Sequence, residues 1–362
     1  MSEARETNDR SLTRVARFPG LRALAWDGNQ LYAGCGYRIM RSTIQNPAQV
    51  AWQPVANFRP RMQRRLSVAH RLSARLFRDG FHALTVLPSG GLIGAVPGAI
   101  VTVHPNEGAF RVTHAIKRGT RPLHITAVPS GAVYWGEYFD NATRDEVHIY
   151  ASDDQGATWN VAYTFPKSAI RHVHNIVHDR WGDCLWILTG DYGNECRILR
   201  ASCDLRNVDV VMQGKQQTRA VAAVPTEDAI YFSSDTPLES NFIYRLDRRG
   251  SLSQLAPISN SSIYGCRVGT HVFFSTMVEP SEVNRDRTVR IYGADVAKAE
   301  SWQALTSWQK DSWPMGLFQY GNAFFPDGDN STRFLAVSTI AVDHDDTVTS
   351  IFVMEGLSGF PS

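Results

Sequence analysis

A short sequence motif occurs seven times along this chain of 362 residues, and one position of it is always Arg, His or Tyr. In each copy the polar residue opens a short apolar segment that runs into a turn, as in His124-Ile-Thr-Ala-Val-Pro-Ser-Gly. The seven residues, spaced by 60, 42, 50, 45, 45 and 56 positions, are Arg22, His82, His124, His174, Arg219, Tyr264 and Tyr320. Spacings of this size indicate a radially repeated sheet, in which all seven side chains would ring one mouth of a central channel.

Acidic residues form a second series, because they follow the next apolar segment in four successive copies of the repeat. The series consists of Glu137, Asp191, Asp235 with Glu239, and Glu279. In a propeller the inner strand begins and the second strand ends at the same face, so both series would meet at one mouth. Such a concentration of titratable groups is typical of an active site, although a single inner-strand His more often makes only structural hydrogen bonds.

Two kinds of bond cleavage fit these residue types. In glycoside hydrolysis one carboxyl group protonates the leaving oxygen while another attacks or activates water. The candidates are Glu137, Asp191, Asp235, Glu239 and Glu279, with sugar-stacking surfaces from Tyr138, Tyr192, Tyr264 and Tyr320. In β-elimination a base removes the proton next to a uronate carboxylate, a cation neutralises that carboxylate, and His or Tyr relays protons. These roles suit His82, His124, His174, Arg219 and Tyr264.

The pair His172-Val-His174 also suggests a metal site. Alternate residues of a strand project to the same side, so the two imidazoles could share one ion. His82 and His124 are the candidates for further ligands, and manganese, calcium and zinc are the metals that we consider. The residues alone leave open whether a metal binds.

Strands must position these groups, because alternating apolar residues separated by Gly, Asn, Asp and Pro turns run from residue 18 to residue 354. This pattern predicts an all-β fold, a seven-bladed β-propeller, with six or eight blades as alternatives. The expected blades are 18–57, 80–114, 119–165, 170–213, 217–257, 260–309 and 313–354. We expect one domain over residues 18–354, closed by pairing of N- and C-terminal strands, with an extension at 1–17 and a tail at 355–362.

The segment Ser152-Asp-Asp-Gln-Gly-Ala-Thr-Trp159 lies between the last two predicted strands of the third blade. At every defined position it resembles the Asp-box hairpin, Ser-x-Asp-x-Gly-x-Thr-Trp, of sialidases and other BNR-repeat propellers. The resemblance implies a propeller fold, a structural role for Asp154 on the outer blade edge, and an association with carbohydrate metabolism. Sialidase activity itself is not expected, because Phe58-Arg59-Pro60 is the nearest equivalent of that family's Arg-Ile-Pro signature.

The His172-Val-His174 pair is similar to the His-x-His pair with which oligogalacturonate lyases, which are cytoplasmic propellers, hold a manganese ion. Only these two histidines match that family's local pattern. The resemblance implies metal-assisted elimination as an alternative to hydrolysis.

Seven arginines lie between residues 59 and 78, together with Leu66, Leu72 and Leu76. This segment predicts one amphipathic helix inserted between the first two blades and packed on the propeller rim. The alternatives are a lid or clamp for an anionic substrate, and contact with a membrane or a nucleic acid.

The composition also bears on the partners and the cellular compartment of the protein. A net charge of +2 is far from the concentrated basic excess of most nucleic-acid binders, so no nucleic-acid partner is expected. No apolar run has the length of a membrane span, and the N-terminus does not resemble a signal peptide. Five cysteines without a C-x-x-C pair suit reduced thiols. We therefore expect a cytoplasmic protein, and the oligomeric state stays open.

We expect a carbohydrate-active enzyme that cleaves an acidic oligosaccharide or polysaccharide at the mouth, with hydrolysis slightly favoured. The alternatives are a metal-assisted lyase and a non-catalytic propeller that binds a glycan or a protein. The expected catalytic residues are Glu137, Asp191, Asp235, Glu279, His174 and Tyr264. The expected substrate contacts are Arg219, His82, His124, Tyr138, Tyr192, Glu239 and Tyr320, and the expected metal ligands are His172, His174, His82 and His124.

Overall fold

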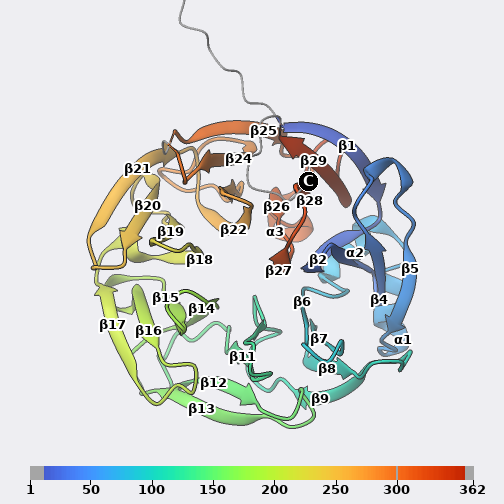
Figure 1. Ribbon diagram of the computed structural model, residues 1–362, viewed down its shortest axis with the longest axis horizontal. Helices are drawn as coiled ribbons and strands as arrows, with labels where there is room; N and C mark the ends of the chain where they lie inside the picture. The colour runs from blue at the N-terminus through green and yellow to red at the C-terminus, as the bar shows by residue number, and fades with distance from the viewer. Residues whose placement is uncertain (1–11, 299–300, 355–362) are drawn as a thin grey trace, which may run out of the picture.

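The computed structural model describes residues 12–298 and 301–354, which form a ring of seven sheets around a central axis (Figure 1). Val, Ile, Phe, Tyr and Trp are common in the strands, and Gly, Pro, Asn and Asp in the hairpins, as expected from their conformational preferences. The expected all-β, seven-bladed propeller is confirmed, and each predicted blade overlaps an observed one.

Each of the first six blades is a meander of four antiparallel strands that runs from the axis outward. Blade 1 consists of β2 (Arg22–Gly28), β3 (Gln30–Cys35), β4 (Arg38–Thr43) and β5 (Gln53–Asn57). Blade 2 consists of β6 (Ala83–Val86), β7 (Leu92–Val96), β8 (Ala99–Val103) and β9 (Arg111–Ala115). Blade 3 consists of β10 (Thr126–Ala127), β11 (Val133–Gly136), β12 (Val147–Ser152) and β13 (Asn160–Phe165). Blade 4 consists of β14 (His172–Asp179), β15 (Cys184–Gly190), β16 (Arg197–Ala201) and β17 (Val208–Gln213). Blade 5 consists of β18 (Ala220–Pro225), β19 (Ala229–Ser234), β20 (Asn241–Asp247) and β21 (Leu252–Ile258). Blade 6 consists of β22 (Ser262–Val268), β23 (His271–Thr276), β24 (Thr288–Asp295) and β25 (Gln303–Gln309).

The seventh blade joins the two ends of the propeller. It contains β26 (Asn322–Phe324), β28 (Phe334–Ile340) and β29 (Val348–Met354), and its outermost strand is the N-terminal β1 (Leu12–Pro19), which is antiparallel to β29. The predicted closure is therefore confirmed. Residues 12–17, expected to be an extension, belong to the propeller, whereas residues 1–11 and the expected tail at 355–362 lie outside the described residues. A short strand, β27 (Asp327–Asn330), adds to β2 in parallel.

Apolar side chains from the facing sheets of neighbouring blades form the core. One cluster joins Val147 and Ile149 of blade 3 to Ile187 of blade 4. The two blades approach so closely that a Cβ atom at Gly136 would lie 2.4 Å from Val173 Cγ1. A glycine at this position therefore sets the distance between β11 and β14, on which the histidine pair lies.

The hairpin between β12 and β13 is held by its own polar side chains. The Asp154 carboxylate accepts hydrogen bonds from the Thr158 N–H at 2.9 Å and the Thr158 hydroxyl at 2.6 Å. Gly156 adopts a left-handed conformation with φ of +80°, and the Trp159 indole donates to Thr113 of blade 2. Asp154 thus stabilises a turn at the outer part of the blade, in agreement with its predicted structural role.

The described chain contains the helices α1 (Met62–Ser67), α2 (Arg71–Phe77) and α3 (Met315–Phe318) and the short 3-10 helices Pro47–Gln49, Gly193–Glu195 and Gln216–Thr218. The prediction of one amphipathic helix over 59–78 is wrong, because the segment forms α1 and α2 with a break between them. Leucines do not form its buried side, since Leu66 is 67% exposed. The buried residue is Arg75, whose guanidinium contacts Asp311 at 2.6 Å and Asp346 at 3.0 Å.

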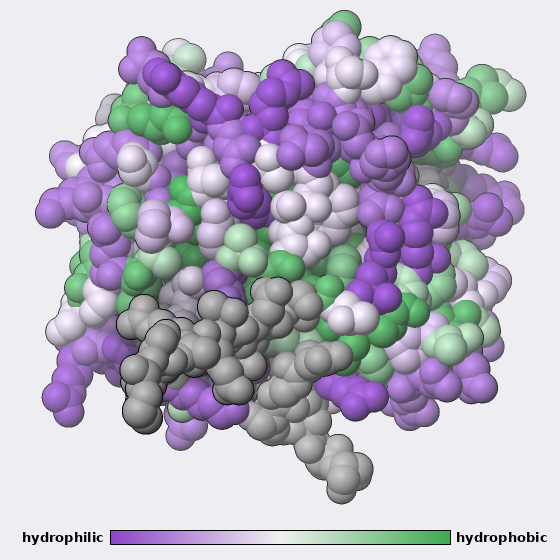
Figure 2. Space-filling view, turned by 90° about the horizontal axis from the view of Figure 1, so that it is seen from above, coloured by the Kyte–Doolittle hydropathy of each residue, from purple (hydrophilic) through white to green (hydrophobic). Residues whose placement is uncertain are grey.

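None of the helices in the described residues has the length and apolar character needed to cross a membrane. The side of the molecule in Figure 2 carries mostly hydrophilic residues, with apolar residues scattered among them.

Candidate metal centre

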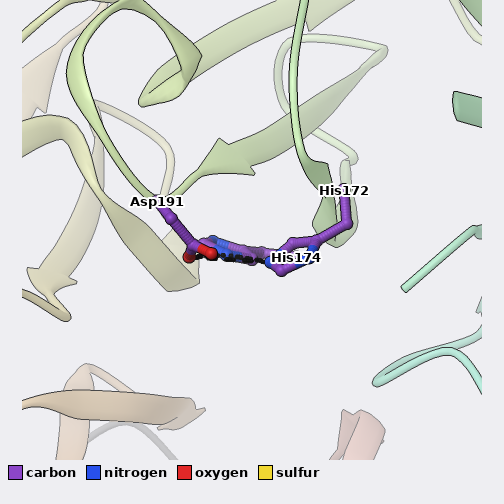
Figure 3. A group of neighbouring side chains, drawn as sticks. All are labelled: His172, His174 and Asp191. Atoms are coloured by element: carbon purple, nitrogen blue, oxygen red, sulfur yellow. Dashed lines mark hydrogen bonds and ion pairs between the residues drawn. The ribbon is translucent and has the colours of Figure 1, made fainter. Parts of the chain in front are cut away.

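Two histidines of the inner strand of blade 4 face the carboxylate that follows its second strand (Figure 3). The Nε2 atoms of His172 and His174 lie 3.1 Å apart, and they lie 3.6 and 3.4 Å from Asp191 Oδ1, respectively. All three residues are buried. The pairing register of β14 with β15 shifts between Val173 and Asn175, which makes His174 the extra residue of a β-bulge. Bulges re-aim side chains, so this one helps both imidazoles to reach Asp191.

Backbone carbonyl groups determine which nitrogen of each ring carries a hydrogen. His172 Nδ1 lies 3.0 Å from the carbonyl oxygen of Phe139, and His174 Nδ1 lies 2.9 Å from that of Ala220. A carbonyl oxygen only accepts, so both Nδ1 atoms donate, and each Nε2 of a neutral ring presents a lone pair. Two imidazole nitrogens and a carboxylate oxygen therefore face one another, and they require a proton or a metal ion between them.

A divalent metal ion fits this arrangement. Ligand atoms about 2.0–2.2 Å from a tetrahedral metal lie about 3.3–3.6 Å apart, close to the three separations seen here. Burial lowers the pKa of His174 despite its contact with Asp191, which disfavours a proton in that place. Imidazole nitrogens suit zinc or manganese better than calcium, which prefers oxygen ligands. His172, His174 and Asp191 would hold the ion and leave further positions to water or substrate.

Two arginines hold the Asp191 carboxylate in place. Arg171 contacts its Oδ2 atom at 3.0 Å, and Arg219 contacts its Oδ1 atom at 3.3 Å. Both arginines favour the ionised form of the Asp191 carboxylate, which is the form that a metal ligand must have.

A second carboxyl group near this centre is poised to exchange a proton. Asp235, which follows β19 and is 7% exposed, lies 3.5 Å from Arg219 Nη2. Burial raises the pKa of Asp235 to about 7; the charge of Arg219 opposes this shift and that of Glu279 reinforces it. Burial also raises the pKa of the half-buried Glu279. The Tyr138 ring lies 4.3 Å from that of His172, and burial raises its pKa to about 12, so the phenol stays protonated.

The other predicted histidines belong to a separate group in the central channel. His82 Nδ1 lies 3.4 Å from Arg22 Nη1, and His124 Nδ1 lies 3.0 Å from Asp327 Oδ2. The expectation that His82 and His124 complete the metal ligands is not met, because these partners occupy them and Asp191 takes the third place. Tyr264 lies beside His124, with ring centroids 6.0 Å apart, and lines the same small cavity.

Four further predicted residues are not among the ligands of the metal centre. Glu137 accepts hydrogen bonds from Arg118 and from the His148 N–H of the neighbouring strand, so its carboxylate is already occupied. Tyr192 and Glu239 line a groove of about 440 Å³ between blades 4 and 5. Within the described part of the chain, no hydrogen bond, ion pair or ring contact joins Tyr320 to the site.

Several arginines around the mouth were not predicted. Arg171 immediately precedes the histidine pair, and Arg121 lies three residues before His124. Their positions beside predicted site residues were the available signal. Arg78 was counted only as one of the arginines of the inserted segment, and the structure places its carbonyl oxygen 2.7 Å from His82 Nε2.

Comparison with known proteins gives the fold alone. No family model matches this chain, and no curated protein matches it. The WD40 β-propeller domain of Doa1 is 10% identical, with a TM-score of 0.59 over 98% of this chain and 100% of that chain. A chain of the mitotic checkpoint complex is 9% identical, with a TM-score of 0.58 over 98% of this chain and 96% of that chain. A puromycin hydrolase is 11% identical, with a TM-score of 0.54 over 90% of this chain and 54% of that chain. At these identities the similarity shows a β-propeller and says nothing about activity.

Proposed function

We propose that this protein is a divalent-metal-dependent enzyme that cleaves an acidic oligosaccharide by β-elimination next to a uronate carboxylate. The observation that carries the proposal is the convergence of His172 Nε2, His174 Nε2 and Asp191 Oδ1 beside Asp235, a carboxyl group whose pKa is about 7. A metal site and a group that exchanges protons near neutral pH are what this elimination needs.

The arrangement favours elimination over the hydrolysis slightly favoured from the sequence. Hydrolysis requires a pair of carboxyl groups, one protonated and one ionised and free to attack or to activate water. Asp235 could serve as the acid, but Asp191 is engaged by the histidines and Glu137 by Arg118. Burial raises the pKa of Glu279, which disfavours the ionised form that would have to attack or activate water. Elimination needs only one such carboxyl group together with a cation that neutralises the substrate carboxylate.

The roles of the residues follow from their positions. A bound metal ion would stabilise the negative charge that develops on the substrate carboxylate when the neighbouring carbon loses its proton. The ionised form of Asp235 would take this proton, the electron pair would form a carbon–carbon double bond, and the bond to the leaving sugar oxygen would break. Tyr138, with its protonated phenol, would donate a proton to that oxygen. Arg171 and Arg219 hold Asp191 in position.

The carbohydrate class rests on the resemblance of the Ser152–Trp159 hairpin to the Asp-box of BNR-repeat propellers. The Asp154 and Thr158 hydrogen bonds agree with that motif and support the resemblance. The cytoplasm, where imported oligosaccharides or cell-envelope precursors would be the substrates, remains the proposed compartment.

The test combines metal binding with product analysis. Purified protein would be stripped with a chelator, titrated calorimetrically with Mn²⁺, Zn²⁺ and Ca²⁺, and incubated with galacturonate oligomers and neutral oligosaccharides. We expect one tight site for Mn²⁺ or Zn²⁺, and unsaturated products, detected by ultraviolet absorbance and mass spectrometry, only with metal and uronate.

His174→Asn should abolish both metal binding and product formation. His104→Asn, which changes an exposed histidine of blade 2, serves as the matched control. Products that contain an added water would establish hydrolysis instead. Saturable binding of the oligomers without any product would establish the non-catalytic alternative.

A further inference from the structure

Three arginines at the mouth have no carboxylate partner. Two other arginines with little exposure are paired, Arg75 with Asp311 and Arg118 with Glu137. Within residues 12–298 and 301–354, Arg22, Arg78 and Arg121 form no ion pair with an Asp or Glu. They come from the inner strand of blade 1, the end of the inserted helices and the segment before blade 3.

Arg22 is held by neutral groups. Its Nη1 and Nη2 atoms lie 3.4 Å from His82 Nδ1 and 3.3 Å from the His82 carbonyl oxygen, and its guanidinium lies 4.0 Å from the centroid of the Phe324 ring. Its Nε–H is buried and has no hydrogen-bond partner. Asp327 lines the same cavity and attracts Arg22 without forming an ion pair, so the environment orients this cation and offsets only part of its charge.

His82 is the common neighbour of the three arginines. Its Nε2–H donates to the Arg78 carbonyl oxygen at 2.7 Å, so its Nδ1 is free to accept from Arg22. Burial and the charges of Arg121 and Arg22 keep the pKa of His82 well below its usual value, so the imidazole is neutral. Burial, with repulsion from Arg22 and Arg78, lowers the pKa of Arg121 to about 10, a value at which it is still charged at neutral pH.

The inserted helices deliver Arg78 to this group. Arg78 ends α2 in a left-handed conformation with φ of 51°, a position where glycine is the usual residue because a side chain adds strain. The buried ion pairs of Arg75 fasten α2 to the loops beyond β25 and β28. The insert therefore places a cation with an exposed side chain at the channel mouth.

We propose that Arg22, Arg78 and Arg121 bind a second carboxylate of the substrate, next to the one at the metal centre. This inference rests on the proposed function for the identity of the ligand as an acidic oligosaccharide. Tyr138 connects the two sites, since its ring contacts that of His172 and it lies within electrostatic range of Arg121. The substrate would then carry acidic groups on neighbouring sugar units, and a chain with a single uronate among neutral sugars would bind weakly.

The experiment measures anion binding without metal or turnover. Chelated protein at low ionic strength would be titrated calorimetrically with galacturonate and with its methyl ester. We expect galacturonate to bind and the uncharged ester not to bind. Arg121→Gln and Arg78→Gln should each weaken galacturonate binding about tenfold or more, as expected for the loss of a charge-assisted hydrogen bond. Because Arg78 is exposed, its variant should fold normally.

Arg267→Gln is the matched control. Arg267 also forms no ion pair in the described chain, but it lies over Trp181 on the hairpin that ends β14, at the opposite end of the propeller. Equal weakening by R121Q and R267Q would show only a long-range charge effect and would overturn the inference, as would equal binding of the methyl ester. Arginine-dependent binding of galacturonate by a protein that produces no cleavage would refute the proposed function and uphold this site.

Discussion

Replacement of Asp235 by Asn tests the electrostatics of the mouth without any substrate. Burial raises the pKa of Asp235 to about 7, compared with about 3.9 in an unfolded chain. Below the unfolded value both states are protonated, and Asp235 does not affect stability. As the pH rises toward 7, the unfolded chain loses this proton and the folded chain keeps it, so the folded state is progressively disfavoured. The difference of about 3 pKa units corresponds to about 4 kcal/mol.

The asparagine variant cannot ionise, so it escapes this penalty. Relative to wild type, Asp235→Asn should gain up to about 4 kcal/mol in the free energy of unfolding as the pH is raised from about 4 to above about 7. The assay is urea unfolding followed by tryptophan fluorescence, in chelator because a bound cation would lower the pKa of Asp235. If the difference between variant and wild type were the same at acidic and alkaline pH, Asp235 would not titrate near neutrality and the reasoning would be refuted.

Asp179→Asn is a control in which the expected effect of pH on stability has the opposite sign. Burial favours a raised pKa for Asp179, but hydrogen bonds from Arg248 and Trp186 outweigh it and hold the pKa below its usual value. Its contribution to stability is therefore present at neutral pH and lost on acidification. D179N should destabilise the protein at neutral pH and have less effect in acid.

The remaining predictions concern the metal centre and the blades. A metal ion at about 100 times its dissociation constant should stabilise the wild type by about 2.7 kcal/mol in thermal unfolding, and Asp191→Asn should show no such gain; an equal gain in both would place the ion elsewhere. Gly136→Ala should cost about 1–3 kcal/mol and weaken metal binding in calorimetry, because its Cβ would press on Val173 between the two ligands. Gly108→Ala, where a Cβ meets nothing within 4 Å, should leave both properties unchanged. Asp154→Ala should lower stability by about 1–3 kcal/mol in urea without changing metal affinity; a loss of affinity would give this outer turn a role at the mouth.

The blades could be predicted because their signals are local. Each strand alternates in hydropathy and each turn carries its own Gly, Pro, Asn or Asp, so the spacing of the repeats reports the architecture directly. The histidine pair could be predicted for the same reason. His172 and His174 lie on one strand, so an error of a residue or two in the predicted strand boundaries does not separate them.

The way in which the ring of polar residues divides into two groups could not be predicted. It depends on partners distant in sequence, since Arg22 engages His82 and Asp327 engages His124. The inserted segment was misassigned as one helix because its leucines suggested an apolar face, whereas the buried ion pairs of Arg75 determine how it packs.

The pairing of β1 with β29 imposes an order on biosynthesis. Leu12 of β1 pairs with Met354 of β29. Because β1 is synthesised before all the other described strands and β29 after them, blade 7 is completed only when β29 has emerged from the ribosome. The four-stranded meanders of blades 1 to 6 are contiguous segments and can form as they emerge, whereas blade 7 requires β1 to pair with β29. Until β29 has been synthesised, the edge strand β1 lacks this partner and is exposed to chaperones, proteases and other nascent chains.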